Sequence, residues 1–336
     1  MNVALETLFY PFQTGVLEPQ GLTLFLNAQN HPALSAFSDI HLQQYFKPYA
    51  SNLDFAGFDV LPDIPDHKEF YDYVLLVVPK NQAETLYMLA RALSALKPGG
   101  LVVAAASNKA GGSRLSKNLA QFVSTPIRAE ARNKCRVVWA AKDAADQKAI
   151  EKAVQDGGPQ NILDGQFQSC PGIFGWNKKD LGSEILLQHL PADLNGAGAD
   201  FGCGYGLLAQ HILQHYTLKN FSCIDADWRA VEMCRINLQS LKSNNAVDFH
   251  WQDLTKSGPD NLDFIVMNPP FHEGKMMDIS IGEAFIKQAA QSLKPGGRLF
   301  MVANRKLPYE PALQHNFSLF KNIFEGQGFK VFCAAK

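Results

Sequence analysis

The chain has 336 residues, a formal net charge of −1, 46% hydrophobic residues and 19% charged residues. This composition is typical of a folded enzyme and excludes a disordered or fibrous chain. The length exceeds what one hydrophobic core usually serves, so we expect two domains.

Cysteine usage and hydropathy indicate the compartment. The six cysteines are scattered and no pair forms a C-x-x-C, so neither a disulfide framework nor a zinc site is expected. No apolar run reaches the roughly 18 residues that cross a membrane, and no basic flank precedes an apolar core at the N-terminus. The sequence predicts a cytoplasmic protein without a metal or a membrane partner, and we expect a monomer.

Charge is unevenly distributed in the first half. Residues 1–67 contain seven acidic residues against Lys47 alone. Residues 107–142 reverse this, with Glu130 against eight basic residues, which are Lys109, Arg114, Lys117, Arg128, Arg132, Lys134, Arg136 and Lys142. Such a segment could meet a polyanion, although a solvated surface would have the same composition.

The first seventy residues give weak patterns. Leu22 to Leu26 resembles a strand, and residues 34–49 fit a helix ended by Lys47-Pro48. From Asp72 the pattern is clearer: a buried-strand run to Val78 precedes a stretch of apolar residues at helical spacing over residues 84–96.

A glycine turn, Lys97-Pro98-Gly99-Gly100, then leads to a strand over residues 101–106, which completes a βαβ unit of an α/β sheet. The same unit recurs 191–197 residues later, from Asp263 through a second Lys-Pro-Gly-Gly turn at 294–297. Duplication explains this recurrence better than chance. We therefore predict two similar α/β domains, residues 1–160 and 161–336.

The second half alternates strands and helices after Pro171-Gly172-Ile173-Phe174. The expected elements are a helix capped at Asp180, strand 198–202, helix 207–216, strand 221–224, helix 229–241, strand 247–251 and strand 263–267. Residues 317–324 and 329–334 predict an antiparallel hairpin at the sheet edge.

A glycine loop lies between the first strand and helix of this half, at Asp200-Phe201-Gly202-Cys203-Gly204-Tyr205-Gly206. Such a loop lets the backbone approach a ligand whose negative end meets the helix N-terminus. The loop alone does not select the ligand, because dinucleotide enzymes and methyltransferases share it.

Carboxylates follow the next two strands. Asp225 comes nineteen residues after Gly206, where it could accept both hydroxyls of a ribose, and Asp227 competes for that role. Asp253 follows the third strand and could accept from an adenine amine. One acidic residue after a strand is usually solvated, but three at successive strand ends form a constellation.

Asn268-Pro269-Pro270-Phe271 follows the fourth strand and selects the chemistry. An amide oxygen and a proline-fixed backbone carbonyl are two acceptors, and an aromatic ring follows them. These parts suit a planar group with an NH₂, held by both N–H bonds and stacked on Phe271. A plain turn after a strand would be the better explanation only for an isolated match.

These motifs resemble class I S-adenosylmethionine-dependent methyltransferases that act on an exocyclic or amide nitrogen. More closely, the chain resembles bacterial rRNA guanine-N2 methyltransferases of the RsmC type, with RlmG as a large-subunit relative. The carrying residues are Pro171 to Phe174, Asp180-Leu181-Gly182-Ser183, Asn268 to His272, Val302-Ala303-Asn304 and Leu307-Pro308-Tyr309. The likeness spans about residues 70–336.

The resemblance implies two tandem Rossmann-like methyltransferase domains with seven-stranded, mostly parallel, doubly wound sheets, of which the N-terminal copy is degenerate. The cofactor would be S-adenosylmethionine, and the partner ribosomal RNA or the small ribosomal subunit. Implied cofactor residues are Asp200, Gly202, Cys203, Gly204, Gly206, Asp225, Asp227, Asp253, Phe174, Asp180 and Gly182. A core position for Phe174 is an equal alternative. Implied RNA contacts are Lys109, Arg114, Arg132, Arg136, Arg305 and Lys306.

The residues themselves indicate that the first domain has lost the cofactor site. Aligning Asp72 with Asp263 sets Val77-Val78-Pro79-Lys80 against Asn268 to Phe271, and no glycine loop precedes the first copy's strand. We expect the first domain to be catalytically inert and to bind RNA or support its twin.

The predicted reaction is methyl transfer to the N2 amine of a guanine in 16S rRNA, with Asn268 orienting the amine rather than acting as a base. Alternatives are a guanine of 23S rRNA, a protein glutamine or a DNA adenine. A non-enzymatic RNA-binding assembly factor is a further alternative. A dehydrogenase is disfavoured, because Asn-Pro-Pro-Phe has no part in hydride transfer.

Overall fold

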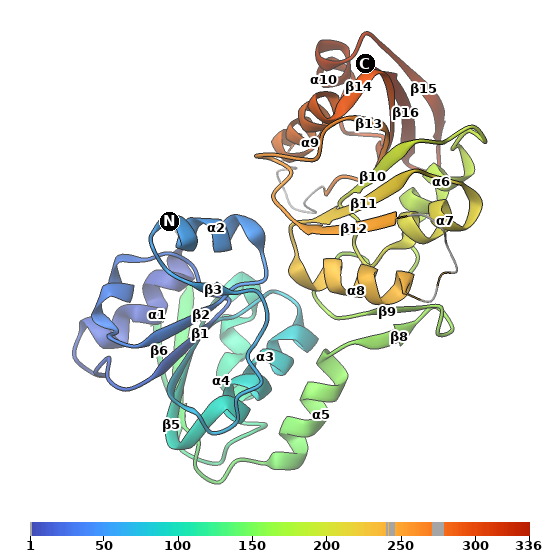
Figure 1. Cartoon of the computed structure of the whole chain (residues 1–336). Helices are drawn as coiled ribbons and strands as arrows, with labels where there is room; N and C mark the ends of the chain where they lie inside the picture. Colours follow the sequence, from blue (N-terminus) through green and yellow to red (C-terminus); the bar gives the residue numbers. More distant parts are fainter. Residues whose placement is uncertain (1, 240, 242–245, 271–278) are drawn as a thin grey trace. The chain divides into compact units, whose positions relative to one another are not determined.

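The computed structural model describes residues 2–239, 241, 246–270 and 279–336. The chain forms two compact units (Figure 1). Unit 1 comprises Met1–Gln160 with Cys170–Gly172, and unit 2 comprises Asn161–Ser169 with Ile173–Lys336.

Unit 1 contains a seven-stranded sheet in the order β3-β2-β1-β4-β5-β7-β6. Its strands are β1 (Thr23–Leu26), β2 (Ile40–Gln43), β3 (Val60–Leu61), β4 (Tyr71–Val77), β5 (Leu96–Ser107), β6 (Arg128–Arg132) and β7 (Cys135–Ala141). The first five strands are parallel, and β7 runs antiparallel to both β5 and β6. The central strand β4 is buried along most of its length, as expected of a parallel strand covered on both faces.

Helices cover both faces of this sheet. They are α1 (Val3–Gln13), α2 (Lys47–Phe55), α3 (Gln82–Ala95), α4 (Leu115–Leu119) and α5 (Gln147–Gly157), with 3₁₀ turns η1 (Pro32–Ala36), η2 (Asn108–Ala110) and η3 (Gly112–Arg114). Alternate residues of β5 enter the two cores: Val102 and Ala104 pack with α3, α4 and α5, whereas Val103 and Ala105 pack with α1 and α2.

Unit 2 repeats the arrangement in the order β12-β11-β10-β13-β14-β16-β15. Its strands are β10 (Ala197–Phe201), β11 (Asn220–Asp225), β12 (Ala246–Trp251), β13 (Leu262–Met267), β14 (Leu293–Asn304), β15 (Leu319–Gly326) and β16 (Phe329–Ala335). Strand β16 runs antiparallel to its neighbours β14 and β15. A separate two-stranded sheet, β8 (Gln160–Ile162) with β9 (Phe167–Ser169), precedes this unit's main sheet in the chain.

The described residues of unit 2 form five helices that pack on its sheet. They are α6 (Leu181–Gln188), α7 (Leu207–His215), α8 (Trp228–Leu238), α9 (Ile279–Ser292) and α10 (Glu310–Asn316). The first three share one core, and α9 and α10 share the core on the other face. The predicted fold class, tandem seven-stranded methyltransferase-like α/β domains, is confirmed.

The two units share an ion-pair clamp as well as a strand order. In unit 1 the carboxylate of Asp72 accepts from Lys97 Nζ at 2.9 Å, and in unit 2 that of Asp263 accepts from Lys294 Nζ at 2.9 Å. In each unit the same carboxylate also accepts the backbone amide at the start of the first strand, at 2.9 and 2.7 Å. Repetition of these contacts supports duplication of one ancestral unit.

Two expectations about elements were wrong. The helix expected over residues 34–49 is instead η1, β2 and the start of α2. Pro48 lies in the first turn of α2, where its missing N–H costs nothing and its fixed φ favours the helix, so it marks a beginning rather than an end. Both Lys-Pro-Gly-Gly segments lie inside long strands, β5 and β14, and not in turns; the sheet absorbs them by a register shift in the pairing with β4 and β13.

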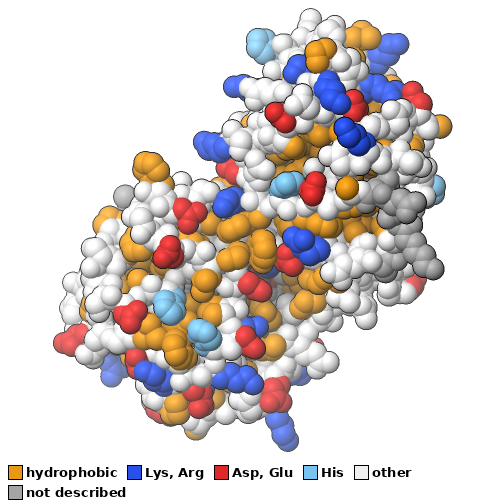
Figure 2. All heavy atoms as spheres, viewed as in Figure 1, with side chains coloured by type: hydrophobic (Ala, Val, Ile, Leu, Met, Phe, Trp, Pro, Cys, Tyr) orange, Lys and Arg blue, Asp and Glu red, His pale blue; other side chains and the backbone are white. Residues whose placement is uncertain are grey.

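Surface features agree with the balanced net charge. Figure 2 shows acidic and basic side chains interspersed on the displayed face rather than gathered in one block. Within the described part of the chain, no helix combines the length and apolar character needed to cross a membrane.

Candidate active site in unit 2

Five strand ends of unit 2 meet at one edge of its sheet, because β12, β11, β10, β13 and β14 are parallel. Phe201 pairs with both Ile224 and Met267. The next residues along these three strands are therefore neighbours at the edge: the glycine loop, Asp225 and Asn268. This is where open α/β sheets bind ligands.

The Asn268 side chain is held in one orientation. Its Nδ2 donates to Asp180 Oδ2 at 2.7 Å and to Ser183 Oγ at 3.0 Å. A carboxylate only accepts, so the amide must present its NH₂ to Asp180. The Asn268 Oδ1 atom is left buried and, within the described residues, has no hydrogen-bond partner. An unsatisfied buried acceptor is costly, which indicates that it awaits a donor.

Asp180 and Ser183 are placed by the start of α6. Asp180 is the N-cap, and its Oδ2 accepts the Ser183 amide at 2.8 Å as well as the Asn268 amide. Asp180 was predicted to contact the cofactor; in the structure it orients the Asn268 side chain. Ser183 carries no such role among the residues predicted from sequence; its position three residues after an N-cap was the available signal.

Two glycines of the loop, Gly206 and Gly204, differ in how closely other atoms surround them. Gly206 is the N-cap of α7 at φ +95°, and a Cβ there would lie 2.9 Å from Cys234 Sγ. Gly204 has φ +53°, and a Cβ there would meet no atom of the described residues within 4 Å. Gly206 is thus required by the fold, whereas the space over Gly204 is available to a ligand.

Asp200 lies fully buried beneath this loop. Burial, and then the charge of Asp225, raise the pKa of Asp200 to about 8. Both Asp200 oxygens lack a hydrogen-bond partner among the described residues, although the backbone amide of Ala209 partly opposes the pKa shift. Cys203, also in this layer, is buried and its thiol hydrogen-bonds with that of Cys234, which raises the pKa of Cys203. The side chains of both residues are therefore buried in the fold.

Asp225 and Asp227 differ in what they already bind. Asp225 Oδ2 accepts the Gly204 amide at 2.9 Å and Oδ1 accepts the Asp227 amide at 2.9 Å, so this carboxylate braces the loop. Burial raises the pKa of Asp225 to about 6, against those backbone amides. Asp227 caps α8 and forms an ion pair with Arg229 at 2.6 Å. The geometry favours Asp225 for a ribose and gives Asp227 a structural task.

The remaining predicted residues lie as follows. Asp253 Oδ1 is engaged with the backbone amide and hydroxyl of Thr255, at 2.9 and 2.6 Å. Phe174 is 59% exposed, which excludes the alternative of a core position. A Cβ on Gly182 would lie 2.9 Å from the Phe329 ring, so this glycine serves close packing of α6.

Of the Asn-Pro-Pro-Phe motif, Pro269 is buried and Pro270 is exposed. Phe271 lies outside the described residues. Arg305 and Lys306 are exposed directly after β14, at the same edge as Asn268, and within the described chain neither forms an ion pair. Among described residues no group of three His, Cys, Asp or Glu side chains could hold a metal ion.

Unit 1 has different residues at the matching strand ends. Leu26 pairs with Gln43 and Leu76, as Phe201 pairs with Ile224 and Met267, so Gln44 corresponds to Asp225 and Val77 to Asn268. Gln44 is fully buried, and its Nε2 donates to Asn27 Oδ1 at 3.1 Å and to the Ala28 carbonyl at 2.7 Å.

Asn27, which takes the place of Gly202, donates in turn to the Val77 carbonyl at 2.8 Å. In unit 1 the side chains of Asn27 and Gln44 therefore bind each other at the positions that Gly202 and Asp225 occupy in unit 2. The strand register therefore places Val77 of unit 1 at the position of Asn268 in unit 2, as the aligned sequences predicted.

The unit 2 residues suit a cofactor that is cationic and carries hydroxyl donors. Asp200 and Asn268 carry buried oxygens that have no partner among the described residues and can accept donors or face positive charge, and the space over Gly204 admits a ligand. A glycine loop, a carboxylate after the second strand and an amide after the fourth, on a sheet ending in an antiparallel hairpin, define a class I methyltransferase.

Comparison with known proteins agrees. The family model "Methyltransferase small domain" matches residues 164–333, and "Methyltransferase small domain N-terminal" matches residues 26–156. Ribosomal RNA small subunit methyltransferase C of Psychromonas ingrahamii is 32% identical over 78% of this chain and 75% of its own length. The protein of the same name from Shewanella sediminis is 30% identical over 92% of this chain and 88% of its own length.

Among solved structures, the T. thermophilus 16S rRNA N2 G1207 methyltransferase (RsmC), in complex with AdoMet and guanosine, superposes with a TM-score of 0.82. The match covers 100% of this chain and 92% of that one, at 23% identity, and so shows a shared fold over both units. The chain belongs to the methyltransferase small domain family and, within it, to the family of ribosomal RNA small subunit methyltransferase C.

Proposed function

We propose that this chain transfers a methyl group from S-adenosylmethionine to the N2 amine of a guanine in 16S rRNA. The observation that carries the proposal is Asn268 Oδ1, a buried acceptor without a partner among the described residues, fixed by two hydrogen bonds from its own Nδ2. An exocyclic amine supplies the missing donor. Membership of the small-subunit methyltransferase C family supports 16S rRNA as the source of that amine.

Bound S-adenosylmethionine supplies an electrophilic methyl group on a sulfonium. Asp225 suits the ribose hydroxyls, because as the last residue of β11 its carboxylate braces the loop and keeps lone pairs at the edge of the sheet. Asp253 suits an adenine amine, and Asp200 contributes negative charge from beneath Gly202 and Gly204. Phe174, being exposed, can cover the cofactor or the base.

The Asn268 carbonyl accepts one N–H of the guanine amine, and the carbonyl of Pro269 is the candidate second acceptor. Holding both hydrogens turns the nitrogen lone pair out of conjugation and toward the methyl donor. Asn268 has no basic lone pair for proton abstraction, so its contribution is orientation. Phe271 keeps its predicted stacking role, which is carried by the sequence motif alone.

RNA contacts are assigned to cations without acidic partners. Lys109, Arg114 and Arg132 are exposed, Arg136 is half-buried, and within the described chain none forms an ion pair. Lys142 from the same segment pairs with Glu69 at 3.5 Å and is structural. We infer that unit 1, a degenerate methyltransferase-like domain, binds RNA, and that Arg305 and Lys306 of unit 2 also contact it. A ribosomal substrate also implies a cytoplasmic enzyme.

Tritiated-methyl transfer to undermethylated small and large ribosomal subunits, followed by nucleoside analysis, tests this function. The expected product is N2-methylguanosine in small-subunit RNA, which mapping should place at the guanine matching the relative's G1207. Product in the large subunit alone would favour the 23S alternative. N2-methylguanosine in neither subunit would refute the proposal.

A further inference from the structure

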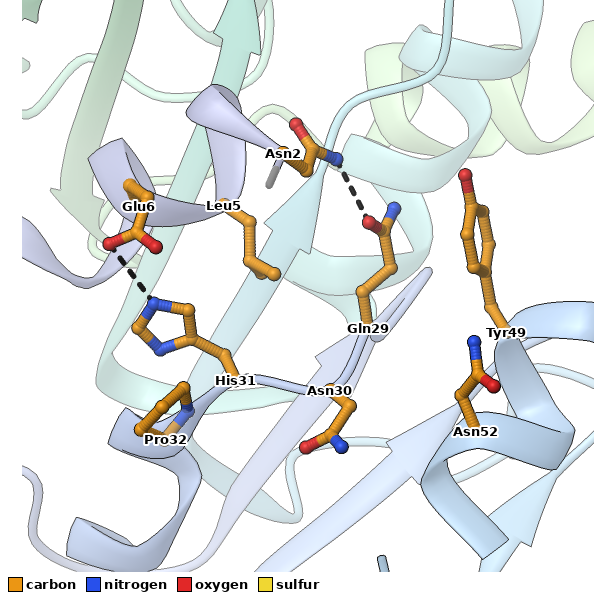
Figure 3. A pocket seen from close by; sticks show the side chains of 9 residues that line it. All are labelled: Asn2, Leu5, Glu6, Gln29, Asn30, His31, Pro32, Tyr49 and Asn52. Carbon is orange, nitrogen blue, oxygen red and sulfur yellow. Dashed lines mark hydrogen bonds and ion pairs between the residues drawn. The ribbon is translucent and has the colours of Figure 1, made fainter. Parts of the chain in front are cut away.

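A pocket of unit 1, lined by amide side chains together with apolar groups, has no role in the chemistry described so far (Figure 3). It is a cavity of about 210 Å³ between the loop after β1 and helices α1 and α2, here called the α1–α2 pocket. The residues that matter to its chemistry are Asn2, Gln29, Asn30, His31, Tyr49 and Asn52.

The pocket lies at the functional edge of the unit 1 sheet. β1 and its parallel neighbours end there, and β1 corresponds to β10, whose following loop is the glycine loop of unit 2. Neither Asn27 nor Gln44, which bind each other at the ends of β1 and β2, lines this pocket, so it is a different space from the position that corresponds to the cofactor site of unit 2.

Most of the polar groups in the lining are uncharged amides. Gln29 Oε1 accepts from Asn2 at 2.9 Å, which leaves its own NH₂ available. Among described residues, the side-chain polar groups of Asn30, Tyr49 and Asn52 make no hydrogen bond. The ionisable pair in the lining, His31 and Glu6, is joined at 3.1 Å. Within the described chain no Lys or Arg lines the cavity, so a phosphate finds no counter-charge there.

One aromatic ring, that of Tyr49 on α2, lines the pocket and is 41% exposed. Outside the lining, the ring of Phe46, the N-cap of α2, lies 5.6 Å from the Tyr49 ring between centroids and is 37% exposed. Proteins use exposed aromatic rings beside amide groups to stack unpaired nucleobases and to bond their edges. A cavity of 210 Å³ lies below the roughly 300 Å³ at which drug-sized pockets begin, which suits one base.

Cations for the attached backbone lie along the same edge. β5 is two strands from β1, or about 10 Å, and it leads directly into η2 and η3 with Lys109 and Arg114. A short stretch of single strand can therefore place a base in the pocket and phosphates on these cations.

From these contacts we propose that the α1–α2 pocket holds one unstacked nucleobase of the RNA substrate, stacked on Tyr49 and hydrogen-bonded by Asn30, Asn52 and Gln29. The inference rests on the proposed function for the identity of the polymer. It gives unit 1 a base-holding site in addition to a basic surface.

The test is fluorescence anisotropy of the full chain with a labelled single-stranded RNA, without S-adenosylmethionine, over a series of salt concentrations. Tyr49→Ala should weaken binding by about 5- to 150-fold, the effect of removing one base–aromatic stack. Its slope of log Kd against log salt should equal that of the wild type, because every phosphate contact is kept. Asn52→Ala should weaken binding with the same unchanged slope. Phe70→Ala is the matched control, since Phe70 is 42% exposed in the same unit and lies outside the pocket lining.

Wild-type affinity in both Tyr49→Ala and Asn52→Ala would overturn the proposal, and so would a weaker affinity accompanied by a flatter salt slope. A self-association of the chain that Tyr49→Ala abolishes would assign the pocket to a second copy instead. RNA carrying 4-thiouridine gives a second readout: cross-links should map to α2, and cross-links confined to residues 173–336 would contradict the proposal. Binding is read without methyl transfer, so failure of the proposed reaction and failure of the pocket are separable.

Discussion

At the scale of single residues, charge beneath the glycine loop couples cofactor binding to pH. With a pKa of about 8, Asp200 is largely protonated at pH 7, whereas Asp225, with a pKa of about 6, is largely ionised. A cationic cofactor favours ionised Asp200, so binding at pH 7 should release protons. Affinity should then rise as pH increases toward about 8 and level off above it.

Calorimetric titration of S-adenosylmethionine in two buffers of different ionisation enthalpy measures this release. Asp200→Asn should abolish the difference between buffers, and Asp260→Asn is the control, because it removes an exposed carboxylate of the same unit that has no assigned role in binding. Identical binding enthalpies in both buffers for the wild type would show that Asp200 does not exchange a proton.

The raised pKa of Asp200 also makes the stability of the folded chain depend on pH. The folded chain holds the Asp200 proton more tightly than the unfolded chain, whose carboxyl has its ordinary pKa of 3.8. The stability contributed by this group is full below that value and is lost as pH rises through about 8. Retaining such a residue in the core is consistent with a functional role for the buried charge.

At the scale of elements, alanine substitutions of two glycines in the loop should have different effects on stability and on cofactor affinity. Gly206→Ala places a Cβ at φ +95° and 2.9 Å from Cys234 Sγ, so it should destabilise unit 2 by more than the roughly 1–3 kcal/mol of backbone strain. Gly204→Ala, at φ +53° with open space, should cost about 1 kcal/mol in folding and chiefly reduce cofactor affinity.

Urea unfolding and calorimetry on both variants separate the two effects. Wild-type cofactor affinity in Gly204→Ala would contradict the placement of the ligand over this glycine.

The elements also show how far sequence reasoning reaches. Strand and helix patterns from Asp72 onward were found because burial on both faces and helical spacing are local signals. The helix expected over 34–49 was wrong because Pro48 stands in the first turn of a helix, where proline favours a start and not a stop. The β15–β16 hairpin was predicted correctly, since Gln327 and Gly328 both have the positive φ that a two-residue turn requires.

Within the site, the strand-end constellation was accessible from sequence, and its internal connections were not. The hydrogen bond that fixes Asn268 is donated to Asp180, 88 residues away in sequence, and it forms only after α6 packs on β14 of the folded sheet. Likewise the Gln44 plug of unit 1 depends on strand register rather than on any local motif. Such partners are set by tertiary packing.

At the scale of the whole molecule, affinity for RNA should depend on cations in both units. Replacing Arg114 and Arg132 by Gln should reduce the slope of log Kd against log salt by about 0.7 for each phosphate of a single strand that is no longer neutralised, and Arg305 with Lys306 should behave alike. Lys152→Gln is the control, because Lys152 is exposed but paired with Asp156 at 2.8 Å. An unchanged slope in both double variants would remove the RNA-binding assignment of these residues.

Duplication gives the molecule an internal comparison. Both units keep the sheet order and the Asp–Lys clamp, so the scaffold alone does not make a site. The units differ at two places. Unit 2 has Asn268, whose Oδ1 lacks a partner among the described residues, where unit 1 has Val77. The loop after the first strand is open in unit 2, whereas in unit 1 Asn27 and Gln44 close it with hydrogen bonds. We therefore expect methyl transfer to depend on Asn268 and not on Val77, its counterpart in unit 1.

The most direct test of this account compares Asn268→Ala with the wild type in two measurements on the same protein: S-adenosylmethionine affinity and kcat for methyl transfer to undermethylated small subunits. Removing a positioned acceptor should lower kcat by about 100- to 1,000-fold while cofactor affinity stays near that of the wild type. An equal fall in cofactor affinity and activity, or retention of activity, would contradict the role of Asn268 as the group that orients the guanine amine.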